Sequence, residues 1–135
     1  MPELPDFDFA SAIGAATEGI SIQSLMLYIP SHDRRGRKLA AQQRWLDEAT
    51  DLLVSIGGGV TIPPPYRGGW LDPQREETVW EDPILPYTYV HAERLEARAA
   101  ALREFLHRMG RETGQGEVAV EFDGAFFRIT DFDPE

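Results

Sequence analysis

Two stretches with the spacing of amphipathic helices, each closed by glycine, most constrain how this chain of 135 residues can fold. In residues 39–56 the apolar side chains recur every three or four positions, and glycines follow at 57–59. Residues 92–109 repeat this spacing, and Gly110 comes next. Such spacing places the apolar side chains on one helix face, and glycine is favoured just past a helix C-terminus. The sequence therefore predicts two helices, each with a face that other elements must cover.

Short runs of the kind that form strands surround these helices. Asp123-Gly124 lies between two alternating runs and is typical of a two-residue hairpin turn. The resulting order is strand, helix, strand, strand, helix, strand, strand. It predicts an α+β fold, a ferredoxin-like βαββαβ antiparallel sheet with two helices on one face and an extra C-terminal hairpin strand. The expected strands are 25–29, 60–62, 85–90, 117–122 and 125–130, with a short extended piece at 77–81.

The length fits one domain. We expect residues 1–19 to form an N-terminal arm with one short helix around 9–16, and residues 20–135 to form a single α+β domain. The N-terminus is acidic where a signal peptide is basic, and no apolar run approaches the roughly 18 residues of a membrane span. With no cysteine, disulfides and thiolate catalysis are excluded. A soluble, cytoplasmic protein is expected, with no membrane partner.

The chain is acidic, since 23 Asp and Glu residues outnumber 13 Lys and Arg and the net charge is −10. Non-specific binding to nucleic acid depends on basic residues that release counterions from phosphate groups. We therefore expect no such binding. An acidic surface suits a protein partner with a basic surface, and displayed aromatic side chains suit a homodimer.

The segment 57–73, GGGVTIPPPYRGGWLDP, is rich in glycine and proline yet carries Tyr66, Arg67 and Trp70. Proline fixes φ and removes a hydrogen-bond donor, while glycine allows positive φ. We expect an irregular loop that holds these three side chains outward as a ligand- or partner-binding surface. The alternative is that Trp70 closes the edge of the sheet and the glycines only turn the chain.

A basic loop, residues 32–38, precedes the first helix and contains Arg34 and Arg35. Free backbone N–H groups and the helix dipole attract anions at such a place. These arginines are therefore candidates for binding a small anionic ligand. A solvated loop tip whose charges offset nearby acids is the alternative.

Two further groups could take part in acid–base chemistry. Glu81 belongs to a cluster of acids that follows the glycine- and proline-rich segment, and His91 stands where a strand meets the second helix. Carboxylates and imidazoles are the common general bases of enzymes, although acids at a surface and single histidines are more often structural. No metal-binding or cofactor motif is present, so neither a metal nor a cofactor is expected.

Residues 104–129, EFLHRMGRETGQGEVAVEFDGAFFRI, together with GGGVT, GGW and TYV earlier in the chain, resemble a family of short, uncharacterised bacterial proteins. The resemblance spans residues 25–132 and implies a compact α+β domain. It implies no reaction and no site.

Two functions follow from these features. The first is a non-enzymatic binding or regulatory protein that engages a partner or ligand through residues 57–73 and the sheet face. The second is a small cofactor-free enzyme with a pocket between sheet and helices, in which His91 or Glu81 is the base and Arg67 clamps an anion. A cavity with convergent polar groups favours the enzyme, and a flat aromatic patch favours the binder.

Overall fold

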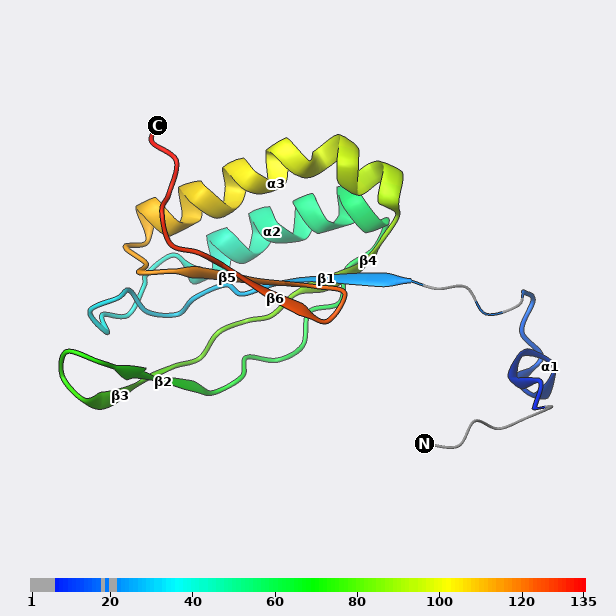
Figure 1. Cartoon of the computed structure of the whole chain (residues 1–135), viewed down its shortest axis with the longest axis horizontal. Coiled ribbons are helices and arrows are strands. Elements are labelled where there is room, and N and C mark those ends of the chain that lie inside the picture. The colour runs from blue at the N-terminus through cyan, green and yellow to red at the C-terminus, as the bar shows by residue number, and fades with distance from the viewer. Residues whose placement is uncertain (1–6, 18, 20–21) are drawn as a thin grey trace.

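The two predicted helices lie side by side on one face of a four-stranded antiparallel sheet (Figure 1). A computed structural model describes residues 7–17, 19 and 22–135. The helices are α1 (Phe9–Ile13), α2 (Gln42–Gly57) and α3 (Ala92–Glu112), and the strands are β1 (Gln23–Leu27), β2 (Gly68–Asp72), β3 (Glu77–Glu81), β4 (Tyr87–Val90), β5 (Val118–Phe122) and β6 (Ala125–Ile129).

The strand order of the main sheet is β4-β1-β5-β6, with every neighbouring pair antiparallel. Beyond β4, Thr61 forms an antiparallel bridge with Tyr87, which marks the second strand of the ferredoxin-like plan. Residues 63–65 are prolines and have no N–H to donate, so this strand does not extend further. At the other edge β6 is the extra hairpin strand. The predicted fold class is confirmed.

Alternating side chains of the sheet build the core against the helices. Leu25, Leu27 and Ile29 point to this side and are buried, and they meet Leu53 of α2 and Met109 of α3. The buried residues of α3 all lie in its C-terminal half. Leu102, which the helical spacing placed in the buried face, is only partly buried at the margin of the core.

One prediction for the glycine- and proline-rich segment is wrong. Residues 68–72 are not an irregular loop but strand β2, which pairs with β3 in a separate hairpin that includes the pair Gly69–Trp80. A Cβ at Gly69 would lie 2.8 Å from the Trp80 ring, so glycine here leaves room for the aromatic side chain. Figure 1 shows this hairpin on the side of the sheet away from α2 and α3.

The N-terminal arm contains α1, which Asp8 caps by accepting a hydrogen bond from the Ser11 N–H at 3.1 Å. No residue of α1 is buried. Across the residues that the structure describes, no helix combines the length and the apolar character needed to cross a membrane.

The turn between β5 and β6 yields the first testable prediction. Asp123 and Gly124 have φ values of 51° and 81°, the paired positive angles of the predicted two-residue turn. Valine at Gly124 is expected to lower the free energy of unfolding by about 1–2 kcal/mol, the usual cost of a left-handed backbone for a residue with a Cβ. Thermal or chemical denaturation measures the change.

Gly59→Val is the matched control, because the φ of Gly59 is not in the left-handed region and a Cβ there meets open space. Equal stability of the two variants would contradict the assignment of strain to the turn.

Candidate functional site

A pocket of about 560 Å³ lies between the β2–β3 hairpin and the face of the main sheet that the helices leave uncovered. Tyr28, Ala119 and Arg128 lie on this face of the sheet. Along their strands they alternate with residues on the opposite face, which carries the core. The volume is in the usual range for sites of small molecules. The sequence-based expectation of a pocket between sheet and helices is therefore wrong, because core side chains fill that space.

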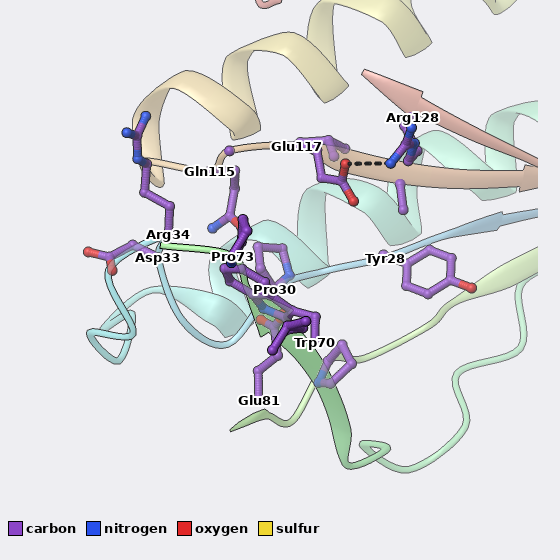
Figure 2. A pocket seen from close by; sticks show the side chains of 15 residues that line it. Tyr28, Pro30, Asp33, Arg34, Trp70, Pro73, Glu81, Gln115, Glu117 and Arg128 are labelled. Atoms are coloured by element: carbon purple, nitrogen blue, oxygen red, sulfur yellow. Dashed lines mark ion pairs between the residues drawn. The ribbon is translucent and has the colours of Figure 1, made fainter. Parts of the chain in front are cut away.

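Aromatic and proline side chains form the apolar wall of the pocket. Trp70 enters from β2, and Pro30 lies near it (Figure 2). Pro83 also lines the pocket. Tyr28 lies on the sheet side, where its ring contacts Phe126 edge to face at a centroid distance of 6.1 Å. Burial, with the Glu121 carboxylate nearby, raises the pKa of the Tyr28 hydroxyl above its ordinary value. Tyr28 is thus a neutral, hydrogen-bonding aromatic at neutral pH.

Glu81 is the carboxyl of the pocket with the most unusual surroundings. Its Oε1 atom is buried and accepts no hydrogen bond from the residues that the structure describes. Burial raises the pKa of the Glu81 carboxyl, and the nearby His32 ring and the backbone N–H groups of Ser31 and His32 only partly oppose the rise. A carboxyl with a raised pKa that lines a pocket is a candidate general acid or base.

The chain around Glu81 is held in place from both sides. The next residue, Asp82, donates its backbone N–H to the Ser31 hydroxyl at 2.8 Å. The Ser31 hydroxyl also lies 2.6 Å from Nδ1 of His32. Two residues on, Ile84 bridges Ile29 and so returns the chain to the main sheet. The end of β3 is therefore attached to the segment that follows β1, and the Glu81 carboxyl has a defined position.

A second charged group lies on the sheet side of the pocket. Glu117 precedes β5, and its Oε2 lies 3.5 Å from Nη1 of Arg128 on β6. Figure 2 shows this ion pair across the pocket from Trp70 and Glu81. On the hairpin side, therefore, an aromatic ring and a carboxyl line the pocket. On the sheet side, one carboxylate and one guanidinium group line it.

The basic loop contributes Arg34 and Asp33 to the lining. Asp33 shapes the loop by accepting hydrogen bonds from the backbone N–H groups of Arg35 at 2.8 Å and Arg37 at 2.9 Å. The stem of Arg34 lines the pocket, but Figure 2 shows its guanidinium group turned away from the cavity. Arg35 is exposed and does not line the pocket.

The structure thus brings together Arg34, Trp70 and Glu81 and leaves the other candidates outside. Tyr66 is exposed on the approach to the hairpin. The Arg67 guanidinium stacks over Trp80, 4.6 Å from the ring centroid, and does not point at an anion site. His91 is the N-cap residue of α3, where its side chain makes no capping hydrogen bond.

Sequence reasoning missed Tyr28 and Arg128. The alternation of the predicted C-terminal strands could have placed Arg128 opposite Ala119 on the face away from the core. Nothing in the sequence shows that a hairpin covers that face. Among the described residues, no group of three or more His, Asp or Glu side chains could hold a metal ion.

No family model matches the sequence, and neither does any curated protein. Two solved structures are similar to this fold. A phage SAM lyase in complex with S-methyl-5'-thioadenosine is 15% identical, with a TM-score of 0.57 over 84% of this chain and 92% of that chain. A phage SAM lyase in the apo state is 14% identical, with a TM-score of 0.56 over 88% of this chain and 98% of that chain. At this identity the similarity is one of fold.

Proposed function

We propose that this protein is a small enzyme that acts on S-adenosylmethionine and releases S-methyl-5'-thioadenosine. The observation that carries the proposal is Glu81, which lines a pocket of about 560 Å³ together with Trp70 and whose Oε1 accepts no hydrogen bond from the described residues. The similarity in fold to the phage SAM lyase supports the choice of substrate. Together they favour the enzyme over the non-enzymatic binder.

The chemistry of the pocket suits a positively charged nucleoside. The faces of Trp70 and Tyr28 offer stacking surfaces for an adenine ring. A tryptophan face and carboxylates both attract a cation such as a sulfonium. Three acids, Asp33, Glu81 and Glu117, line the pocket against two arginines.

The proposed reaction is an elimination that breaks the bond between the sulfonium sulfur and Cγ of the amino-acid part. The electron pair stays on sulfur, which becomes the neutral thioether of S-methyl-5'-thioadenosine. Glu81 is placed as the base that takes a proton from Cβ of the amino-acid part, and the electrons of that C–H bond form the Cβ–Cγ double bond of the released unsaturated amino acid. Because burial raises its pKa, its carboxylate is a stronger proton acceptor than an exposed glutamate.

The test is to incubate the purified chain with S-adenosylmethionine and follow S-methyl-5'-thioadenosine by liquid chromatography. Calorimetry with each of the two compounds measures binding independently of turnover. We expect both to bind and the thioadenosine to accumulate faster than in a sample without protein. Absence of binding of both compounds would overturn the proposal.

Trp70→Ala is expected to weaken the binding of S-methyl-5'-thioadenosine by about 1–3 kcal/mol, the usual loss when an aromatic side chain that stacks on a base is removed. The matched control is Trp80→Ala, because Trp80 lies on the same hairpin but does not line the pocket. Calorimetry on both variants measures the difference. An equal loss of affinity in the two would show that Trp70 does not contact the ligand.

The sequence-based prediction that Trp70 also supports self-association stays a prediction. Sedimentation of the same two variants tests it, since a role of Trp70 in a homodimer would lower the association constant of Trp70→Ala alone. Membership in the bacterial family that the sequence resembles likewise stays a proposal.

A further inference from the structure

We infer that the Glu117–Arg128 ion pair binds the α-ammonium and α-carboxylate groups of the substrate's amino-acid part. This inference rests on the proposed function and adds a specificity site to it. The pair lines the same pocket as Glu81 but lies on its sheet side.

The two side chains reach the pocket because of the register of the C-terminal hairpin. Arg128 pairs with Ala119 across β5 and β6, and Val118 on one side of Ala119 points into the core. Arg128 and Ala119 therefore face the pocket, and Glu117 meets Arg128 there with an N–O distance of 3.5 Å. Figure 2 shows the pair opposite Trp70 and Glu81.

Stability alone does not account for this pair. Arg128 and Glu117 have side chains that are 62% and 47% exposed, and exposed pairs of this kind contribute little to folding. This ion pair uses only part of the hydrogen-bonding capacity of the two side chains, because a guanidinium has five N–H donors and a carboxylate has two acceptor oxygens. Within the described part of the chain, neither residue takes part in a second ion pair.

An α-amino acid presents a cation and an anion on neighbouring atoms. Arg128 can bind the carboxylate through two parallel N–H···O bonds, and Glu117 can accept from the ammonium group. Because the pair and the amino acid are each neutral overall, no charge is left uncompensated. The nucleoside then lies toward Trp70, with the sulfonium between the two ends and close to Glu81. Arg34 is the other arginine of the pocket, but its guanidinium is turned away.

This arrangement separates substrate from product. S-adenosylmethionine carries both amino-acid charges, and S-methyl-5'-thioadenosine carries neither. The ion pair should therefore strengthen the binding of the substrate and have no effect on that of the product.

The experiment compares Arg128→Gln and Glu117→Gln with the unmodified chain by calorimetry, using both compounds. We expect each variant to bind S-adenosylmethionine about 10- to 100-fold more weakly, the usual effect of losing a hydrogen bond to a charged group. Affinity for S-methyl-5'-thioadenosine should change less than about 2-fold, within the reach of a distant surface charge. The control is Arg44→Gln, since Arg44 forms a similar exposed ion pair with Glu112, at 3.8 Å, outside the pocket.

Three results would overturn the inference. If both compounds lose affinity equally in Arg128→Gln, the pair acts on the shape of the pocket and not on the amino acid. If neither loses affinity, or if Arg44→Gln has the same effect, the pair does not contact the substrate. In all these cases the unmodified chain still binds both compounds, whereas failure of the proposed function shows as binding of neither.

Discussion

Replacing Glu81 by glutamine is expected to lower the rate of release of S-methyl-5'-thioadenosine about 10²- to 10⁴-fold, the usual contribution of a general base. The amide has nearly the shape of the carboxyl but cannot take a proton. Substrate binding should survive, because Trp70 and the Glu117–Arg128 pair remain in the pocket. Chromatography of the product under single-turnover conditions measures the loss.

Glu77→Gln is the control for this variant. Glu77 begins the strand that Glu81 ends, is exposed, and does not line the pocket. Its replacement should leave the rate within about 2-fold of that of the unmodified chain, as expected for surface substitutions. Equal rates for the Glu81 and Glu77 variants would show that Glu81 is not the base.

The raised pKa of Glu81 also predicts how stability depends on pH. The carboxyl has an ordinary value of 4.5, and burial raises it in the folded protein. The folded state therefore holds this proton to a higher pH than the unfolded state does. The unmodified chain should be as stable as Glu81→Gln below pH 4.5. It should become less stable than the variant as the pH rises through the folded pKa. As the pH rises through the folded pKa, the rate of release of S-methyl-5'-thioadenosine should increase, because the proposed base must be ionised.

Leu53→Ala is expected to lower the free energy of unfolding by about 2–5 kcal/mol, the range for fully buried leucines. Leu53 lies on α2 with 0% exposure, between the sheet and α3. Its loss leaves a cavity that neighbouring side chains can fill only in part. Denaturation in urea at constant pH measures the change.

Val54→Ala is the matched control, since Val54 is the next residue of α2 and is 42% exposed. Its effect should stay within about 0.5 kcal/mol. A small effect of Leu53→Ala would contradict the observed core. For Leu102→Ala, the helical spacing alone predicts a loss of about 2–5 kcal/mol in the free energy of unfolding. The loss should be smaller, because Leu102 is only partly buried.

Local patterns explain why much of the fold could be predicted. The apolar spacing of α2 and α3, the glycines that follow α2, and the Asp123-Gly124 turn each depend on residues close in sequence. Helical hydrogen bonds and two-residue turns join near neighbours, so their signals are visible in a short window. The order of these elements was then sufficient to predict the ferredoxin-like fold.

The candidate site was predicted only in part. Arg34, Trp70 and Glu81 were among the candidate residues, and all three line the pocket. The pocket was expected on the wrong side of the sheet, because the two helices were assigned to one face and the hairpin was not recognised. Glycine and proline indicated a loop at 68–72, yet pairing with β3 makes a strand there.

The sequence by itself determined which segments become the two helices, the outer strands and the tight turn, since each follows from interactions between neighbours in the chain. Only the tertiary structure decided that β2 and β3 lie over the open face of the sheet, where Trp70 and Glu81 line the same pocket as the Glu117–Arg128 pair. The hairpin residues Trp70 and Glu81 precede the ion pair by about 36 to 58 positions in the sequence. Their meeting depends on long-range packing, and the raised pKa of Glu81 depends on the burial that this packing creates.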